Sequence, residues 1–272
     1  MSICIVMVFT ITACSKKERT MILATTTSTQ DSGLLDYLLP LFEKDTGIKV
    51  KVLALGTGEA LEVAKRGDAD GLLVHAKSQE VKFVEEGFGT ERLEVMYNDF
   101  IIVGPKDDPA KLKEKAPKDA VEAFKLLNSS QASFVSRGDK SGTNTKELAI
   151  WKNAGIEPTG EWYISAGKGM GAVLTMASEK KAYTLTDRAT YLNMKDNLDL
   201  DIVTEKGSDF LNQYAFIRLD SSKNKIKEEE ANEFIEWMIS SKRQQLIGEY
   251  GKGKFGMPLF TPNAIRTNTK NR

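Results

Sequence analysis

MILATTTSTQDSGLLDYLLPLFEKDTGIKVKVLALGTGEALEVAKRGDADGLLVH, residues 21–75, alternates short apolar runs with amphipathic segments. The apolar or alternating runs predict strands at residues 21–25, 48–55 and 72–75. Between the strands, apolar residues from Leu34 to Phe42 recur at helical spacing and stop at Gly47, and residues 60–66 predict a second, shorter helix. A β-α-β-α-β order builds a parallel sheet with helices on both faces.

The remainder of the chain repeats this rhythm from residue 120 to residue 193. Two apolar runs, 99–103 and 214–219, flank that region and would carry the chain from one lobe to the other and back. The sequence therefore predicts an α/β fold of two lobes joined by two crossover strands, with a ligand cleft between the lobes. Lobe 1 comprises residues 21–104 plus 214–272, and lobe 2 comprises residues 105–213.

Composition narrows the function. The 272 residues include 38 Lys and Arg against 38 Asp and Glu, so the net charge is zero. Because the chain has no net positive charge, it has no overall electrostatic attraction for a polyanion, and nucleic acid is not expected as a partner. One His and two Cys exclude a disulfide scaffold and a Cys4 zinc site, and they supply His-based catalysis poorly. We therefore expect no catalytic residues, no metal site and no cofactor, and any bound anion must be captured locally.

The N-terminal segment predicts that the protein is located outside the cytoplasm. Residues 1–13, MSICIVMVFTITA, carry no charge and are too short to span a bilayer, which is typical of a signal peptide. The sequence from Ile11 to Cys14 looks like a bacterial lipobox, in which the thiol of Cys14 receives a lipid. Residues 14–20 would then be a tether to the membrane surface. The alternative is ordinary signal cleavage with an incidental cysteine.

Four loops at predicted strand-to-helix junctions carry the donors that an anion needs. The first holds hydroxyls at every position from Thr25 to Thr29, and the second is the turn Gly56–Gly58. The third, residues 136–143, adds an Arg to further hydroxyls, and the fourth is the glycine-rich segment 167–171. Helix N-termini offer free N–H groups and a positive dipole end, and hydroxyls add further donors. Simple helix capping, a tight turn or a solvated Arg are the alternatives for individual loops.

Three stretches of the sequence stand out: TTTS at 25–28, YNDFIIVGPKDDPA at 97–110 and SRGDKSGT at 136–143. Together they resemble the substrate-binding components of tungstate ABC transporters. The resemblance runs through most of the chain. It implies a type II periplasmic-binding fold, hinge closure around the anion, and delivery to a membrane permease by a protein that acts as a monomer and is not an enzyme. Transferred position by position, the family's motifs fall on the ligand-binding candidates Thr27, Ser28, Thr57, Arg137, Ser141 and Thr143.

Departures from the family pattern leave alternatives open. Phosphate-binding relatives usually add a carboxylate after the third strand, where this chain has His75-Ala76, so tungstate or molybdate is favoured over phosphate. Tungstate-family members usually have Asp at position 76, and Lys140 and Asn144 also differ from the usual pattern. His75 is expected to be a hydrogen-bonded core residue, and Asp187 with Arg188 would either face the cleft or hold the lobe as an ion pair. An enzyme acting on a phosphate or sulfate ester is the rival class, using Arg137 as an oxyanion clamp.

Overall fold

The computed structural model describes residues 18–265. Three parallel strands form the predicted sheet, in the order β3-β1-β2, and the chain then adds two long antiparallel strands and a short edge strand, giving the order β10-β4-β9-β3-β1-β2. The strands of this sheet are β1 (Arg19–Thr26), β2 (Ile48–Leu55), β3 (Gly71–Val74), β4 (Gly89–Gly104), β9 (Leu211–Leu219) and β10 (Thr261–Pro262). The predicted signal peptide, residues 1–13, and Cys14 lie outside the described residues.

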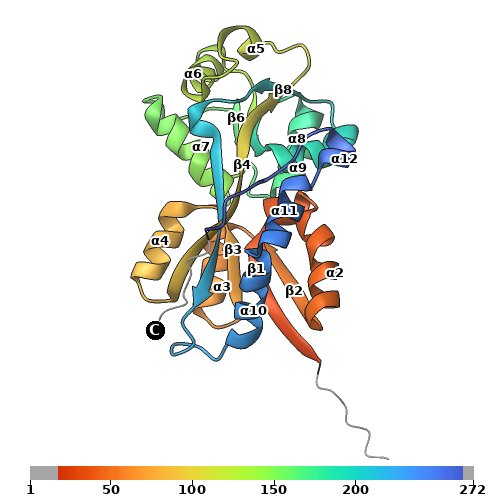
Figure 1. Cartoon of the computed structure of the whole chain (residues 1–272). Helices are drawn as coiled ribbons and strands as arrows, with labels where there is room; N and C mark the ends of the chain where they lie inside the picture. Colours follow the sequence, from red (N-terminus) through yellow and green to blue (C-terminus); the bar gives the residue numbers. More distant parts are fainter. Residues whose placement is uncertain (1–17, 266–272) are drawn as a thin grey trace, which may run out of the picture.

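Helices cover both faces of the sheet in the first lobe, as the β-α-β-α-β order predicts (Figure 1). They are α1 (Thr27–Asp31), α2 (Leu34–Thr46), α3 (Thr57–Lys65), α4 (Lys77–Glu85), α10 (Glu228–Met238), α11 (Ser241–Glu249) and α12 (Lys252–Phe255). On one face α2 and α10 bury Phe42 and Phe234 against each other, and on the other face Leu61 of α3 and Phe83 of α4 lie in a second cluster. Helix α2 ends where Gly47 adopts a left-handed conformation (φ 72°), which glycine tolerates without strain.

Two strands cross between the lobes. Figure 1 shows β4 and β9 running side by side from the lower lobe into the upper one. Beyond the crossing, β4 pairs with β7 (Thr184–Asp187) and β8 (Asp201–Thr204). Phe100 and Ile102 of β4 pack into the apolar core of the second lobe, so one strand contributes to both cores.

The second lobe is a smaller α/β unit, built around a buried aromatic cluster with Trp151 at its centre. Its other elements are α5 (Leu112–Lys115), α6 (Ala120–Ser130), β5 (Phe134–Ser136), α7 (Gly142–Asn153), β6 (Tyr163–Ser165), α8 (Met170–Lys180), α9 (Arg188–Met194) and the 3₁₀ turns Lys195–Asn197 and Ser208–Phe210. The mixed α/β architecture with two lobes confirms the predicted fold class. The lobe boundaries at residues 104 and 214 stay a proposal.

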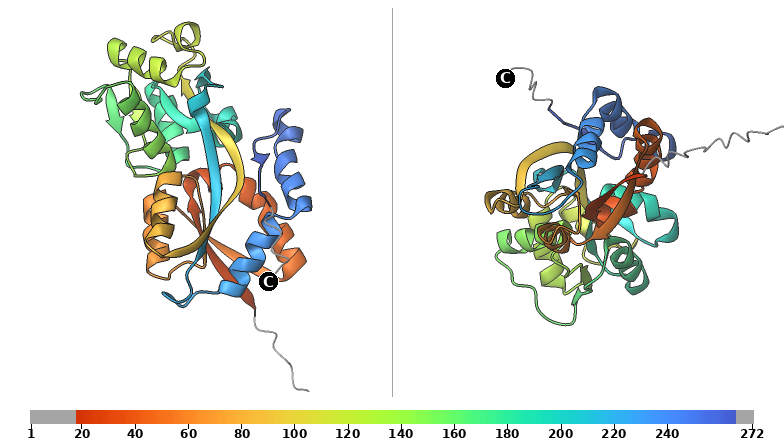
Figure 2. Two further views of the ribbon diagram at one scale, coloured as in Figure 1. Left: turned by 60° about the vertical axis from the view of Figure 1, so that its left-hand side comes forward. Right: turned by 90° about the horizontal axis from the view of Figure 1, so that it is seen from below.

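Three features differ from the prediction. Strand β1 begins at Arg19, so Arg19 and Thr20 belong to the sheet instead of the tether, because Arg19 pairs with Ile48 and binds Glu233 at 2.8 Å. Strand β4 begins at Gly89, ten residues before the predicted run, because its polar first half is held by β9. After α10, the amphipathic terminal helix that the apolar residues between Ala231 and Ile239 predict, the chain adds α11, α12 and β10, which return along the molecule (Figure 2).

Within residues 18–265, no helix is both long enough and apolar enough to cross a membrane.

Candidate oxyanion site

Arg137 joins the two lobes at the centre of the candidate site. It follows strand β5 in the second lobe, and only 1% of its surface is exposed. Its guanidinium donates to Ser28 Oγ at 3.0 Å and to Thr27 Oγ1 at 2.9 Å, both in the first lobe, and it also pairs with Asp139. A buried cation is stabilised only when its donors are matched, and here two of its partners are hydroxyls from across the cleft.

The hydroxyl groups of Thr27 and Ser28 accept hydrogen bonds from this cation. An accepting hydroxyl still has its own proton to donate. Because the guanidinium polarises both groups, their O–H bonds become better donors toward an anion that touches them. Other hydroxyls of residues 25–29 do not accept from Arg137. Thr25 donates to the carbonyl of Leu73, and Thr26 is hydrogen-bonded to Thr29 within its own lobe.

The loop after β5 brings Ser141 and Thr143 to the N-terminus of α7. Ser141 is the N-cap, and its Oγ accepts from the N–H of Asn144 at 3.1 Å, which again leaves a hydroxyl proton free to donate. Three buried polar atoms of this site have no hydrogen-bond partner among the described residues: Thr57 Oγ1, Thr143 Oγ1 and Arg137 Nε. Since buried polar groups in native proteins are nearly always paired, these atoms are suited to a ligand that supplies acceptors.

Glycines let the lobes approach closely. A Cβ at Gly142 would lie 2.9 Å from both Nδ1 and the carbonyl oxygen of His75, and a Cβ at Gly56 would lie 3.0 Å from the carbonyl oxygen of Asp139. At Gly169 it would meet Thr27 at 3.2 Å. Each of these contacts joins one lobe to the other. The glycine-rich turns therefore allow a closed arrangement in which all four predicted loops meet.

The structure brings the predicted ligand residues into one region. Arg137 touches Thr27 and Ser28 directly, Ser141 and Thr143 lie in the Arg137 loop, and Thr57 begins the helix whose N-cap, Gly56, faces that loop. The fourth loop closes on the first, because the N–H of Met170 donates to Thr27 Oγ1 at 3.4 Å. The binding role of these residues stays a prediction.

Two carboxylates at the site were missed by sequence reasoning. Asp139 accepts from Arg137 and from the N–H of Ser141 at 3.2 Å, so each of its oxygens already accepts one hydrogen bond. Asp31 accepts from the N–H of Gly171 at 3.0 Å, and burial raises the pKa of its carboxyl. The spacing of Asp139, two residues after Arg137, was the available signal. An acid therefore lies beside Arg137 even though the loop after the third strand, at residues 75–76, carries none.

His75 is a hydrogen-bonded core residue. Its Nδ1 lies 2.8 Å from Asn212 Oδ1 and its Nε2 lies 3.0 Å from Thr26 Oγ1. Burial, together with the nearby charge of Arg137, lowers the pKa of His75 to about 4. Its imidazole is consequently neutral near pH 7.

The departures from the family pattern have local explanations. Ala76 is the N-cap of α4 and offers no side-chain cap, and the buried carboxylate of Glu80 accepts the N–H of Ala76 instead. Burial raises the pKa of Glu80 to about 7, although Arg92 at 2.7 Å opposes this shift. Asn144 accepts the N–H of Lys140 at 3.1 Å and so shapes the Arg137 loop.

Asp187 and Arg188 do not bind each other. Arg188 donates to Asp99 at 2.6 Å and pairs with Glu205 at 2.7 Å. Asp187 is the N-cap of α9 and accepts from the N–H of Thr190 at 2.9 Å. These contacts hold the second lobe against β4.

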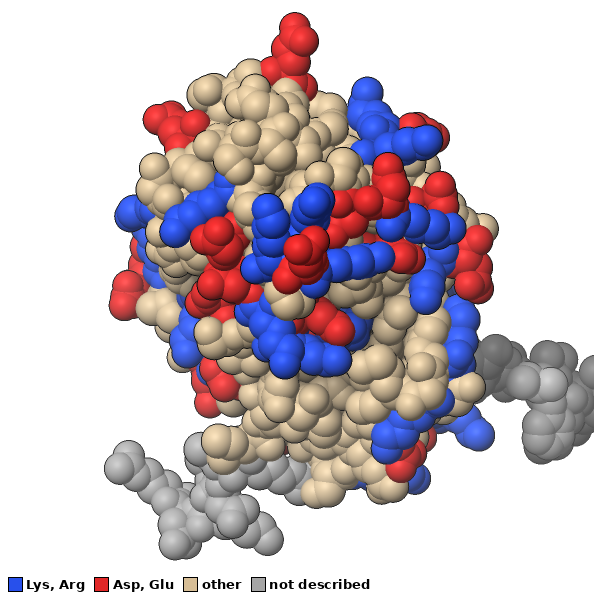
Figure 3. Space-filling view, turned by 90° about the horizontal axis from the view of Figure 1, so that it is seen from above, with Lys and Arg blue, Asp and Glu red and all other residues tan. Residues whose placement is uncertain are grey.

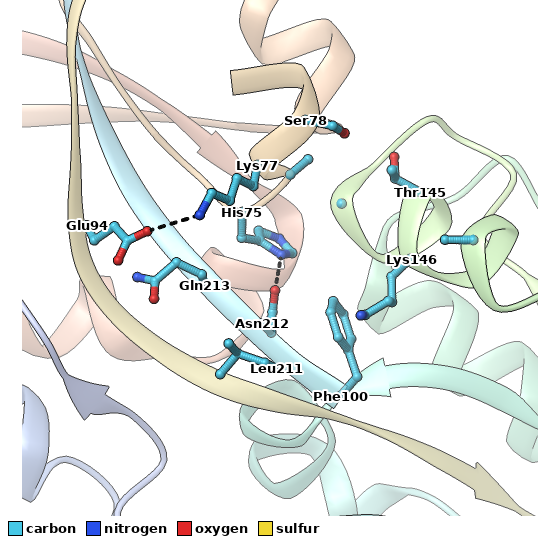
Figure 4. Close-up of a pocket in the computed structure, with 13 residues that line it drawn as sticks. His75, Lys77, Ser78, Glu94, Phe100, Thr145, Lys146, Leu211, Asn212 and Gln213 are labelled. Carbon is cyan, nitrogen blue, oxygen red and sulfur yellow. Dashed lines mark hydrogen bonds and ion pairs between the residues drawn. The ribbon is translucent and has the colours of Figure 1, made fainter. Parts of the chain in front are cut away.

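Charge is mixed over the surface that Figure 3 shows, where lysines and arginines alternate with acidic residues. A cavity of about 460 Å³ adjoins the candidate site, and Figure 4 shows His75, Asn212 and Lys146 on its wall. None of the six predicted ligand residues lines it. In the part of the chain that is described, no group of three or more His, Cys, Asp or Glu could hold a metal ion.

Comparisons with known proteins identify relatives that cover most of the chain. The family model for the PBP superfamily domain matches residues 12–242. The tungstate-binding protein TupA of Peptoclostridium acidaminophilum is 57% identical over 253 residues, which cover 93% of this chain and 88% of that protein. The tungstate-binding protein TupA of Campylobacter jejuni is 41% identical over 243 residues, covering 87% of this chain and 88% of the relative.

Solved structures of similar proteins also superimpose on most of this chain. The crystal structure of the tungstate ABC transporter from Geobacter sulfurreducens superimposes with a TM-score of 0.79 at 49% identity, covering 86% of this chain and 99% of that chain. The tungstate-binding protein from Desulfovibrio alaskensis superimposes with a TM-score of 0.72 at 42% identity, covering 91% of this chain and 100% of that chain.

Proposed function

This chain belongs to the PBP superfamily and, within it, to the tungstate-binding proteins of ABC transporters, and from that premise we propose that it captures tungstate outside the cytoplasm and delivers it to an ABC permease. The matched relatives are named as tungstate-binding proteins, and one matched structure is that of a tungstate ABC transporter, so the protein is not an enzyme. The ester-hydrolysing alternative is set aside for this reason. The proposed function needs only binding, closure and release.

A single observation carries the proposal: a buried Arg137 bridges the lobes, and its Nε, Thr57 Oγ1 and Thr143 Oγ1 are buried atoms without a hydrogen-bond partner within residues 18–265. Tungstate is a tetrahedral dianion whose four oxygens only accept hydrogen bonds. The candidate site offers the guanidinium of Arg137 and donor protons from five hydroxyl residues. These residues are Thr27, Ser28, Thr57, Ser141 and Thr143. Fixed neutral donors arranged around one cation bind by geometry, which favours one shape of anion over others.

Closure contributes to binding because the donors come from both lobes. Thr27, Ser28 and Thr57 belong to the first lobe, and the Arg137 loop belongs to the second. A ligand held by both sets favours the closed arrangement by its differential affinity for that state. Release to a permease then requires the lobes to separate.

Calorimetric titration of the protein lacking residues 1–17 with tungstate, molybdate, phosphate and sulfate tests the proposal. We expect tungstate to bind most tightly and phosphate to bind at least ~100-fold more weakly, because the six residues proposed to contact the anion act as donors, whereas the proton of hydrogenphosphate would need an acceptor among them. Phosphate binding equal to or tighter than tungstate binding would overturn the assignment. Molybdate has the same charge and shape, and comparable molybdate affinity would make the protein a carrier of both oxyanions.

The lipid anchor is part of the proposal and depends on Cys14. Two or more acyl chains give a durable anchor, since each buried CH2 contributes ~0.8 kcal/mol. In cells that make the full chain, Cys14→Ser should move the protein from the membrane fraction to the soluble fraction and abolish labelling with radioactive palmitate. Unchanged membrane association in this variant would exclude the anchor.

Delivery to a permease by a monomer completes the proposed function. Adding tungstate-loaded protein to its reconstituted transporter should stimulate ATP hydrolysis, and sedimentation should give the mass of one chain. A transporter that responds equally to free tungstate would rule out the delivery role.

A further inference from the structure

Two sequence motifs that the oxyanion site does not use meet at the crossing between the lobes. YNDF at 97–100 lies on β4, and TLTDR at 184–188 runs from β7 into α9. The two strands pair antiparallel, with Phe100 opposite Asp187. Asn98 Nδ2 donates to Asp187 Oδ1 at 3.3 Å, and Arg188 binds Asp99. Asn98 also forms a hydrogen bond with a residue outside these two motifs.

A continuous chain of buried hydrogen bonds runs from Asp187 to the loop that carries Thr27 and Ser28. Asn212 Nδ2 donates to Asn98 Oδ1 at 2.7 Å, and Asn212 Oδ1 lies 2.8 Å from His75 Nδ1. His75 Nε2 lies 3.0 Å from Thr26 Oγ1, which lies 2.7 Å from Thr29 Oγ1. We call these six side chains the hinge chain: Thr29, Thr26, His75, Asn212, Asn98 and Asp187. All six are buried.

The chemistry of the groups sets the direction of the hinge chain. Because the amide nitrogen of Asn212 donates to Asn98, its oxygen must accept, and His75 must carry its proton on Nδ1. The unprotonated Nε2 then accepts from the hydroxyl of Thr26, and Thr26 accepts from Thr29. At the other end Asp187 is an acceptor once ionised, and burial raises its pKa to about 6, so it is ionised near pH 7. Every donor thus points from the ligand loop toward Asp187.

The hinge chain passes through both crossover strands. Asn98 of β4 and Asn212 of β9 face each other in the strand register. On the first-lobe side the chain ends at Thr26 and Thr29, which flank Thr27 and Ser28. On the second-lobe side Thr190 Oγ1 lies 2.7 Å from Asp187 Oδ2 and 3.1 Å from the carbonyl oxygen of Ser28, so its single proton is shared between Asp187 and the ligand loop.

We propose that Asn98, Asn212 and His75 are positioning residues that hold the ligand loop in register with the crossover strands, so that the hinge sets the orientation of Thr27 and Ser28. This inference rests on the proposed function, since it assigns a role in binding. None of the three is among the residues proposed to touch the anion. A directed chain with every member paired is rigid, whereas losing one member leaves buried groups unsatisfied and loosens the loop.

The single imidazole of the chain provides a direct probe. In the ligand-free protein near pH 7, the ¹⁵N resonances of His75 should show the neutral tautomer with the proton on Nδ1. The tautomer with the proton on Nε2 would overturn the direction of the hinge chain. This readout needs no ligand, so it separates failure of the inference from failure of the tungstate assignment.

Asn98→Leu tests the coupling to binding. We expect tungstate affinity to fall about tenfold, the size typical of changes within a coupling network, and the ¹⁵N resonances of His75 to shift although residue 98 does not touch the ring. Wild-type affinity with unchanged His75 resonances would overturn the proposal. Asn232→Leu, at a partly buried site in α10 that bonds Arg218, is the matched control and should change neither readout.

If Asn98→Leu does not fold, Asn98→Ser takes its place, because its shorter side chain is polar but cannot span the distance between Asn212 and Asp187. The same shift of His75 and a smaller loss of affinity are then expected. Tungstate binding within twofold of wild type, with His75 unmoved, again overturns the inference. If the wild type itself fails to bind tungstate, the proposed function fails, and the tautomer of His75 still decides the hinge chain.

Discussion

Replacing Arg137 with Gln should weaken tungstate binding at least ~100-fold. Arg137 supplies the cation of the site, and truncating a buried, hydrogen-bonded charge costs about 3 kcal/mol or more, which corresponds to two orders of magnitude in affinity. The hydroxyls of Thr27 and Ser28 lose the polarising donor as well. Isothermal titration calorimetry measures this effect, and thermal unfolding of the ligand-free variant shows whether the fold is kept.

Arg66→Gln is the matched control. It removes the same charge from an exposed position whose partner is Asp68, far along the chain from the Arg137 loop. Its tungstate affinity should stay within twofold of the wild type. If Arg137→Gln binds as tightly as this control, Arg137 is not part of the binding site.

A side chain at Gly142 should hold the lobes apart. The Cβ of Gly142→Val would come within 2.9 Å of the His75 backbone in the closed arrangement, and a carbonyl oxygen cannot move aside as a flexible side chain can. Because closure brings the Arg137 loop to the first lobe, we expect affinity to fall by on the order of 100-fold, as for the loss of Arg137. Small-angle scattering should show a larger radius of gyration that tungstate no longer reduces.

Gly253→Val serves as the control, because a Cβ at Gly253 meets no atom within 4 Å. This variant should bind tungstate and contract like the wild type. The double variant Arg137→Gln with Gly142→Val should bind about as weakly as either single variant, since both changes remove the same contacts. Full tungstate affinity in Gly142→Val would show that binding does not depend on this closure.

Local patterns predicted most of the elements. The strand at 48–55 has the predicted bounds, and the helix that begins at Leu34 stops before Gly47 as the left-handed cap requires. These elements are set by residues close in sequence. The first half of β4 could not be predicted in this way, because Glu91, Arg92 and Glu94 are polar and adopt a strand only by pairing with β9, more than 100 residues later.

In the candidate site, too, features set by residues close in sequence could be predicted, and features that depend on distant contacts could not. Hydroxyls and an Arg at helix starts indicated an anion site, and the structure brings those loops together. The position of Asp139, two residues after Arg137, could have indicated from the sequence alone that a carboxylate lies beside this cation. The hinge chain was beyond sequence reasoning, since Asn98, Asp187 and Asn212 are separated by long stretches of chain and meet only because two strands cross between the lobes. The resemblance included the stretch around Asn98 without explaining the role of that residue.

The position of the bound anion tests the central claim most directly. Crystals of the protein with tungstate, measured at the tungsten absorption edge, would place the metal atom by its anomalous signal. We predict one strong peak whose surrounding oxygens accept hydrogen bonds from Arg137, Ser28 and Thr143, with Thr27, Thr57 and Ser141 completing the shell. A peak elsewhere, such as in the neighbouring cavity beside Lys146, with none within reach of Arg137, would contradict the account.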